Sequence, residues 1–405
     1  MSRDKIEKLE ELLAQRIGEN RKIVSTNITR LTAPGDNYGG LLLRVDVTLK
    51  NKDGKEEELN VVAKCIPVNL FFQMIFNIQV SVKKEIAFYD TVVPTLRQFQ
   101  EEQGVENVMD FFPTIYGSRL NLNGSDVVDE NSAIILENLA KSGYQNVDRT
   151  VGFDLATIKM ILTDLATFHA TSLALKVVKP EVFENKVRPH LTPIKLPSPL
   201  EREEHGGKGP YGVIHEVLEE CAEIEPIRSK VKEIQLFAKN VAERPFFTVA
   251  HGDVWVNNIM VKFEDGNPVD SKFVDFQNYG FRSPVADLLF LMWCSVEQKV
   301  LEENFDSLIK FYHENFVENL VQLKCDPAPF SFENFLEEIR AEVGNIIGQV
   351  AFMCTFVVFI KKDGISMGQD PSKPPDLGMK DVTPEAKQRL RFILKKCHEK
   401  GWLQM

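Results

Sequence analysis

The sequence has few of the features that mark disulfide-stabilised or metal-stabilised proteins. Only six of its 405 residues are cysteine, and no two of them form a Cys-X-X-Cys pair or recur at a fixed spacing. Neither a disulfide framework nor a zinc site is therefore indicated. Tryptophan and tyrosine are also scarce, with three and seven residues, but phenylalanine is abundant, with 28. Because phenylalanine supplies a large apolar area, we expect a substantial core.

Positive charge is in deficit along the chain. The 48 Lys and Arg residues are outnumbered by 59 Asp and Glu residues, which gives a net charge of −11. A chain of this charge has no global attraction to nucleic acid, so we expect no nucleic-acid partner. The N-terminal residues 1–17 place charged and apolar side chains at helical spacing and lack the apolar core of a secretory signal. Together with the lack of a disulfide framework, this predicts a cytoplasmic protein.

No apolar run in the sequence reaches the length of a membrane span. The longest extends from Ile346 to Ile360 and is interrupted by Gly348, Gln349 and Thr355, whereas a bilayer span needs about 20 apolar residues. We therefore expect a buried helix here and no membrane span. The overall length corresponds to about two domains, and a monomer is the default expectation.

The first third of the chain has the pattern of a sheet with one or two helices. Residues 41–50 alternate between apolar and polar side chains, and the turn-forming residues 51–54 separate them from a second strand at 59–66. Helical spacing follows over 71–99, and another apolar strand lies at 132–137. This part of the chain predicts a small lobe rich in strands.

After residue 140 the spacing is mostly helical. It predicts helices over 153–175, over 211–243 and throughout 284–404, with a short β-like island at 246–276. The proline-rich stretch 179–210 is expected to be a long irregular connection. A small sheet-rich lobe is thus followed by a larger helical lobe.

The strongest motif is the string HGDVWVNN at residues 251–258, which an apolar strand links to Asp275. Asp253, an asparagine five residues later (Asn258) and a second aspartate 22 residues after the first are the residue types that phosphoryl transfer requires. One carboxylate must orient the attacking hydroxyl and accept its proton. An amide oxygen and a second carboxylate must hold Mg²⁺, which prefers oxygen ligands. The alternative, a simple turn and a strand-end cap, accounts poorly for the combined spacing.

Upstream residues provide the predicted nucleotide side of such a site. Lys64 lies on a predicted strand after a glycine-bearing loop, where a kinase needs a cation for the α- and β-phosphates. Glu85 lies on a predicted helix and is placed to pair with Lys64. The strand that ends at Glu137, followed by Leu139, is expected to be the hinge between the lobes, with backbone groups that pair with the adenine edge.

These motifs resemble those of the ecdysteroid kinase-like family, in the choline kinase and aminoglycoside phosphotransferase branch of kinase-like folds. The matching strings are HGDVWVNN, VDFQ at 274–277, SPVADL at 283–288, LATFHA at 165–170 and LENL at 136–139. The resemblance implies an α+β, bilobal protein-kinase-like fold, with a sheet-rich N-lobe at 1–138 and a helical C-lobe at 139–405. It also implies ATP and Mg²⁺ as cofactors and a small-molecule alcohol as acceptor. The best-known acceptors of the family are steroid hormones of the ecdysone type.

The resemblance assigns a role to each residue of the predicted site. Asp253 corresponds to the catalytic base, Asn258 and Asp275 to the metal ligands, and Lys64 to the phosphate lysine held by Glu85.

Three further residues are expected to support the site without taking part in the chemistry. His251 resembles the structural histidine of the catalytic loop. Asp287 resembles the buried aspartate that braces this loop by accepting backbone hydrogen bonds. His169 is expected to be a core histidine with its hydrogen bonds satisfied.

The sequence departs from protein kinases in three places. Gly35, Gly39 and Gly40 do not form a GxGxxG loop, so Gly39 and Gly40 are only the expected region of phosphate contact. Gln277 replaces the glycine of a DFG motif, as in the family it resembles. No APE-like segment follows, so a protein substrate is not expected.

Several functions fit these residues. The first is an ATP-dependent kinase of an ecdysteroid or another lipophilic alcohol, which includes xenobiotic alcohols. The second is a kinase of choline or ethanolamine, which would need an aromatic cage, with Trp255, Trp293 and phenylalanines as the candidate residues. The third is a catalytically silent ligand-binding protein. Phenylalanines of the helical lobe suit a lipophilic acceptor, although core packing explains them equally well: Phe290, Phe311, Phe316, Phe330, Phe352, Phe356 and Phe359.

Overall fold

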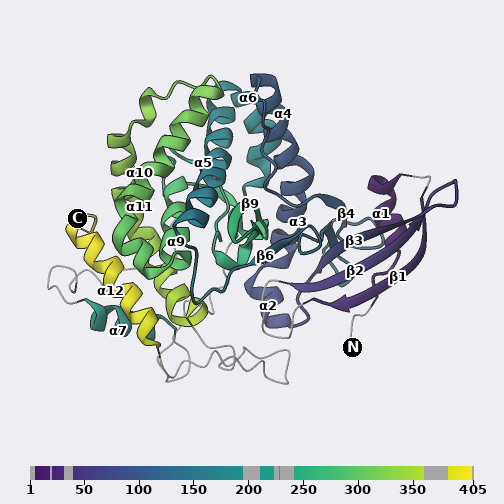
Figure 1. Ribbon diagram of the computed structural model, residues 1–405, viewed down its shortest axis with the longest axis horizontal. Helices are drawn as coiled ribbons and strands as arrows, with labels where there is room; N and C mark the ends of the chain where they lie inside the picture. The colour runs from purple at the N-terminus through teal and green to yellow at the C-terminus, as the bar shows by residue number, and fades with distance from the viewer. Residues whose placement is uncertain are drawn as a thin grey trace.

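The fold combines an N-terminal antiparallel sheet with a larger helical part, which lie side by side (Figure 1). The computed structural model describes residues 5–18, 21–31, 40–194, 210–222, 228, 241–359 and 382–403. This arrangement confirms the predicted α+β fold with a sheet-rich N-terminal part and a helical C-terminal part.

The N-terminal sheet has five strands in the order β1-β2-β3-β5-β4, and every neighbouring pair is antiparallel. Along β2 the apolar residues of the alternating pattern are buried and the intervening ones are half-buried. Helix α1 (Leu9–Ile17) packs on this apolar face, with Leu13 fully buried against the strands. The strands are β1 (Lys22–Arg30), β2 (Leu41–Lys50), β3 (Glu56–Cys65), β4 (Ile115–Arg119) and β5 (Ala133–Glu137).

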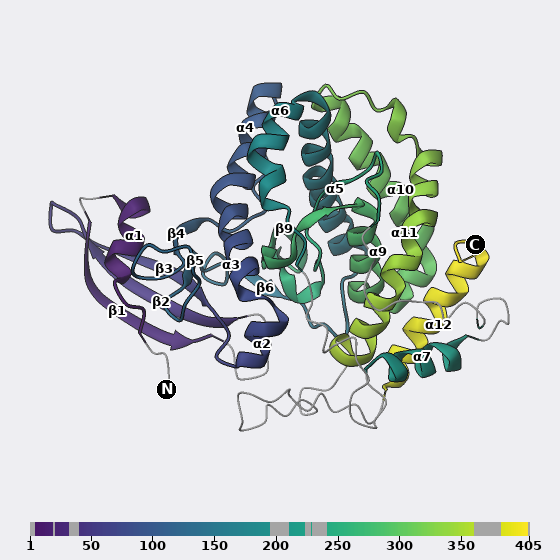
Figure 2. The ribbon, with the colours of Figure 1, turned by 180° about the vertical axis from the view of Figure 1, so that it is seen from behind.

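A helical segment connects β3 to the rest of the molecule. Asn69 caps α2 by accepting hydrogen bonds from the amides of Phe71 and Phe72. The segment then continues through α3 and a π-helical turn, η1, into α4, which packs against the long helix α5 (Figure 2). Its elements are α2 (Leu70–Ile75), α3 (Ile78–Ala87), η1 (Phe88–Val92) and α4 (Val93–Gln103).

The helical part is built around α9, all of whose residues are buried. Long helices α5, α10 and α11 surround it, and Asp154 caps the first turn of α5. The helices after residue 150 are α5 (Leu155–Val178), α6 (Pro180–Val182), α7 (Pro210–Cys221), α9 (Pro284–Ser295), α10 (Gln298–Gln322), α11 (Phe332–Met353) and α12 (Pro384–Glu399). Shorter helical turns are η2 (Phe183–Val187), η3 (Arg188–His190), η7 (Ala328–Phe330) and η8 (Cys354–Val358).

Two small sheets carry the predicted motifs between these helices. One pairs β7 with β10, and the other has the order β6-β8-β9. They consist of β6 (Tyr144–Asn146), β7 (Thr248–Ala250), β8 (Ile259–Glu264), β9 (Asn267–Phe273) and β10 (Gly280–Arg282). The turns η5 (Val256–Asn258) and η6 (Phe276–Asn278) follow β7 and β9.

The expectation for the connection at 179–210 is wrong in its first part. Residues 180–190 form α6, η2 and η3, because Pro180 and Pro189 occupy positions in the first turn of helical segments, where a missing amide hydrogen costs nothing. Residues 195–209 lie outside the described residues.

The predicted buried helix at 346–360 is confirmed over its described part, because it lies within α11 and η8. By length and composition, two helices are able to cross a membrane, at 155–178 and 332–358. In each of them 67% of the apolar window is buried inside the protein, as in a core helix.

Candidate active site

Lys64 lies at the centre of the candidate site, on β3. Its Nζ atom is 2.6 Å from Oε2 of Glu85 and 2.8 Å from Oδ1 of Asp275, so it joins α3 to the strand end after β9. Burial by itself would lower the pKa of Lys64, but the Asp275 and Glu85 carboxylates more than offset this and raise it. The predicted Lys64–Glu85 pair is confirmed. The direct contact with Asp275 was not predicted.

Glu85 is almost fully removed from solvent, with 2% of its side chain exposed. Burial raises the pKa of this carboxyl, and the Lys64 ammonium acts in the opposite direction. Its second oxygen, Oε1, has no hydrogen-bond partner among the described residues. A cavity of about 10 Å³ borders Glu85, Lys64 and Gln277, which is about the room that one water molecule needs.

The loop after β7 brings Asp253 and Asn258 together. The side-chain amide of Asn258 donates to Asp253 at two points, to Oδ2 over 3.2 Å and to the backbone oxygen over 2.9 Å. This orients the Asp253 carboxylate and leaves the amide oxygen of Asn258 on the opposite side of the group. The backbone carbonyl of Asn258 accepts from the amide of Val274 over 2.9 Å, which ties the loop to the strand end that carries Asp275.

Asp287 braces this loop from the first turn of α9. Its carboxylate accepts hydrogen bonds from the backbone amides of His251, over 2.6 Å, and Gly252, over 2.9 Å. It also accepts from Nε2 of His169, whose Nδ1 lies 2.7 Å from the hydroxyl of Tyr312. Burial alone would raise the pKa of Asp287, but the hydrogen bond from His169 and the nearby basic groups, including Arg282, together more than offset this and hold the pKa below its usual range. The expected roles of Asp287 as a brace and of His169 as a satisfied core histidine are confirmed.

His251 supports the same loop through both ring nitrogens. Nε2 donates to the carbonyl of Val274 over 3.0 Å, and Nδ1 accepts from the amide of Asp253 over 3.3 Å. Burial lowers the pKa of His251, which favours this neutral tautomer. The predicted structural role of His251 is therefore confirmed by its contacts.

Asp275 has a left-handed backbone conformation, with φ of 67° and ψ of 62°. Such a conformation costs on the order of 1–3 kcal/mol for a residue other than glycine, so the surroundings must hold it. The next side chain, Phe276, stacks on Phe88 of η1 with ring centroids 3.7 Å apart and is fully buried. This stack fixes the backbone that directs Asp275 towards Lys64.

Asp253 is half-buried beside a second carboxylate. Loss of hydration and, next in size, the charge of Asp275 raise the pKa of Asp253 well above its usual range. A raised pKa makes a carboxylate a stronger proton acceptor, which suits a general base.

The donor atoms of the site fit Mg²⁺. They are the carboxylate oxygens of Asp275 and the amide oxygen of Asn258, both hard ligands. No group of three or more His, Cys, Asp or Glu side chains within the described ranges is placed to hold a metal. Mg²⁺ usually takes one or two protein carboxylates and completes its shell with water and phosphate oxygens.

The predicted hinge residues form hydrogen bonds with each other and with neighbouring residues of the chain. The amide of Leu139 donates to the carbonyl of Glu137 over 3.2 Å, and the Leu139 carbonyl accepts from Tyr144 over 3.0 Å. The Glu137 carboxylate accepts from the amide of Thr114 and from the hydroxyl of Ser142. Adenine pairing at Glu137 and Leu139 stays a prediction.

Of the predicted phosphate-loop glycines, the structure places Gly40 beside the site. A side-chain carbon at Gly40 would lie 2.9 Å from the carbonyl oxygen of Cys65 and 3.4 Å from the Lys64 side chain, so only glycine fits here. Gly35 and Gly39 lie outside the described residues.

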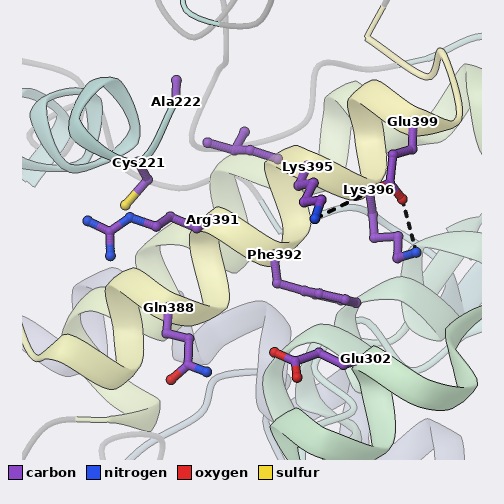
Figure 3. Close-up of a pocket in the computed structure, with 10 residues that line it drawn as sticks. Cys221, Ala222, Glu302, Gln388, Arg391, Phe392, Lys395, Lys396 and Glu399 are labelled. Carbon is purple, nitrogen blue, oxygen red and sulfur yellow. Dashed lines mark hydrogen bonds and ion pairs between the residues drawn. The ribbon is translucent and has the colours of Figure 1, made fainter. Parts of the chain in front are cut away.

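A second hollow lies away from these residues. It is a cavity of about 480 Å³ between α7, α10 and α12, bordered by charged side chains of α12 and by Cys221 and Glu302 (Figure 3). None of the predicted site residues lines it.

Two basic residues beside the site were missed at the sequence level. Lys84 precedes Glu85 on α3, and Arg282 ends β10, seven residues after Asp275. The burial of Lys84 has no counterpart in the sequence pattern, because two consecutive lysines in a charged helix are typical of an exposed face.

The ecdysteroid kinase-like family model matches residues 34–325 of the chain. Among solved structures, the GDP complex of a mutant aminoglycoside 2′-phosphotransferase-IIIa has 13% identity and a TM-score of 0.36, covering 84% of this chain and 96% of that chain. The wild-type GDP complex has 12% identity and a TM-score of 0.36, with coverage of 85% and 88%. A GDP and kanamycin complex has 12% identity, a TM-score of 0.28 and coverage of 83% and 96%. These TM-scores are too low to support an argument, and no curated protein matches the chain.

Proposed function

The chain belongs to the ecdysteroid kinase-like family, and from this we propose that it is an ATP-dependent, Mg²⁺-requiring kinase that phosphorylates a hydroxyl group of a small molecule. One observation carries the proposal. Lys64 contacts both Glu85 and Asp275, while Asp253 and Asn258 are held together on the adjoining loop. A cation for phosphates, oxygen ligands for a metal and a carboxylate base are thus assembled from distant parts of the chain.

Each of these residues has a definite task in phosphoryl transfer. Asp253 orients the acceptor hydroxyl and takes its proton as the oxygen attacks the γ-phosphorus. The new oxygen–phosphorus bond forms as the bond from the γ-phosphorus to the bridging oxygen breaks, which leaves ADP. Lys64 neutralises charge on the nucleotide phosphates, and Glu85 keeps its ammonium in place.

Asn258 and Asp275 would hold the metal. When bound, Mg²⁺ neutralises charge on the phosphate oxygens. The Asn258 amide also positions the base, because its nitrogen donates to the Asp253 carboxylate. The loop that carries Asp253 is in turn held by Asp287, whose carboxylate accepts hydrogen bonds from two backbone amides of this loop.

We propose a lipophilic alcohol, such as an ecdysteroid or a xenobiotic alcohol, as the acceptor. The family membership supports this class. The phenylalanine surplus adds little, because Phe290, Phe316, Phe330 and Phe356 are buried in the core.

The burial of Trp293 excludes it as a cage residue in the choline or ethanolamine alternative. Trp293 is fully buried and stacks on Phe305 within the helical core, so it does not face a substrate. Trp255 is half-buried and lies two residues after Asp253.

An ATP-consumption screen against hydroxylated steroids, phenolic alcohols and choline tests the proposal. We expect turnover that requires Mg²⁺, with lipophilic alcohols preferred over choline. A parallel thermal-unfolding titration with Mg·ATP separates this from a silent ligand carrier, which need not be stabilised by the nucleotide. No nucleotide-dependent stabilisation and no turnover with any acceptor class would contradict the proposal.

A further inference from the structure

Lys84 is a buried cation that lies next to the candidate site and takes no part in it. Only 5% of the residue is exposed, and its Nζ atom donates to the backbone carbonyl of Thr192 over 2.8 Å. The ammonium lies 5.1 Å from the ring centre of Tyr279. An ammonium has three donors, and among the described residues two of them find no acceptor and no carboxylate forms an ion pair with Lys84.

Arg282 is a second cation beside the same short segment, residues 278–279. Its guanidinium makes one long hydrogen bond, to the carbonyl of Asn278 over 3.4 Å, and no ion pair within the described ranges. It lies against the catalytic loop, since a side-chain carbon at Gly252 would be 3.1 Å from its Nη2 atom. Gly252 has φ of +80°, and that carbon would also meet the Asn278 carbonyl at 2.5 Å. Glycine is thus what allows the guanidinium to lie beside the loop that carries Asp253.

Both cations lie beside residues 278–279, Lys84 next to the Tyr279 ring and Arg282 at the Asn278 carbonyl, and among the described residues no carboxylate forms an ion pair with either. Burial is the main cause that lowers the pKa of Lys84 to about 7, and the charge of Arg282 is the second cause. The charge of Arg282 also acts to lower the pKa of the Asp287 and Glu342 carboxyls. Both are already engaged, however, Asp287 with the loop amides and Glu342 with Arg244. Buried charges in proteins are normally paired, and among the described residues no free carboxylate offers Lys84 and Arg282 a partner.

We propose that Lys84 and Arg282 form a binding site for a dianionic oxyanion, a phosphate or sulfate group, between α3 and β10. Two positive charges match a dianion, and the fork of a guanidinium suits its oxygens. A bound anion would connect α3, which carries Glu85, to the segment after Asp275. It would therefore favour the arrangement in which Lys64 touches both carboxylates. The group could arrive as a free anion or as a substituent of the acceptor.

Thermal unfolding at pH 6, below the lowered pKa of Lys84, with sodium sulfate at an ionic strength held constant with sodium chloride, tests the site directly. We expect a saturable rise in Tm for the wild-type chain. Lys84→Met and Arg282→Met should each weaken the apparent affinity about tenfold or more, as loss of a charged contact does. Lys83→Met is the matched control, because Lys83 is the neighbouring residue, is more exposed and pairs with Asp126. Arg340→Met, on an exposed arginine paired with Glu337, is the control for Arg282.

A purely structural role for Lys84 makes a different prediction. If Lys84 only anchors Thr192, Lys84→Met lowers Tm in chloride and leaves the sulfate response intact. In our account Lys84→Met raises Tm in chloride, because it removes an uncompensated buried charge, and it weakens the sulfate response. Lys84→Arg retains the charge and should retain the response. Should Lys84→Met fail to fold, Lys84→Arg and Arg282→Met decide the question.

Any of three outcomes overturns the proposal. The first is the absence of a saturable sulfate effect in the wild-type chain, and the second is an equal effect in all variants. The third is loss of the effect in saturating Mg·ADP, which would place the anion in the nucleotide site. These measurements need no turnover, so failure of the proposed kinase activity leaves the result interpretable.

Kinetics then separate the two sources of the anion. If the site binds a free anion, added sulfate should change the rate of transfer to a neutral acceptor more in the wild-type chain than in Arg282→Met. If the anion is part of the acceptor, Arg282→Met should lower kcat/KM more for the sulfate monoester of a related acceptor than for the neutral compound.

Discussion

Replacing Asp287 by asparagine tests whether a buried carboxylate supports the catalytic loop. The side chain is 2% exposed and accepts from two loop amides, at 2.6 and 2.9 Å, and from His169. In Asp287→Asn one carboxylate oxygen becomes an NH₂ group, which cannot accept. One amide, of His251 or Gly252, then loses its partner.

The expected cost follows from these contacts. A buried donor left without an acceptor costs about 1–3 kcal/mol, and the remaining bonds lose the charge-assisted part of their strength, about 1 kcal/mol. We therefore expect Asp287→Asn to lower the free energy of unfolding by about 2–4 kcal/mol. Because the pKa of Asp287 is held below its usual range, the carboxylate contribution is complete at neutral pH. It is lost only as pH falls through that lowered pKa.

Urea unfolding at pH 7 measures this loss, and Asp126→Asn provides the control. Asp126 is 89% exposed, so its substitution should change stability by no more than about 0.5 kcal/mol. In the kinase assay, Asp287→Asn should lower kcat more than nucleotide affinity, since the carboxylate contacts the loop of Asp253. Wild-type stability together with wild-type kcat would refute the reasoning.

Further predictions concern burial, aromatic packing and the metal. Burial raises the pKa of Asp164 to about 7, so the folded state loses stability as pH rises from 3.8 towards 7, and the full cost persists above pH 7. Asp164→Asn keeps an acceptor for the Ser271 hydroxyl. In urea unfolding it should raise the free energy of unfolding by on the order of 1–3 kcal/mol at pH 8 and by less at pH 5. An equal gain at both pH values would contradict this. Phe88→Ala removes the stack on Phe276 and should cost about 3–5 kcal/mol in the same assay, whereas Phe71→Ala, at a half-buried site, should cost clearly less. Chelation with EDTA should abolish phosphoryl transfer, and added Mg²⁺ should restore it; transfer that continues in EDTA would exclude the metal role.

The sequence allowed the main strands and the site motifs to be predicted because their signals are local. The alternating residues of β2 and the turn before β3 specify a hairpin, and Gly54 has the expected left-handed conformation. The exposed strand β1 was missed, because its side chains are mostly solvent-facing and show no alternation. Strand β4 was also missed, because it is only five residues long and contains Gly117, against which the backbone of α1 packs.

Long-range contacts limited what could be predicted about the site. The Lys64–Glu85 pair followed from the residue types that nucleotide binding requires. Lys84 and Arg282 both lie beside residues 278–279 although they are almost two hundred positions apart, and no spacing rule predicts this. The phenylalanine surplus also needed the structure, which shows that Phe88, Phe112, Phe168 and Phe276 form one buried aromatic cluster behind the site.

The most direct test of the account is phosphoryl transfer by Asp253→Asn. The substitution keeps the size of the side chain and an acceptor for the Asn258 amide, and it removes the base. We predict that Mg·ATP still stabilises the variant in thermal unfolding, while transfer to an accepted alcohol falls by about 10²–10⁴-fold, the usual contribution of a general base. Asp253→Asn with undiminished transfer would contradict the central claim that this carboxylate activates the acceptor hydroxyl.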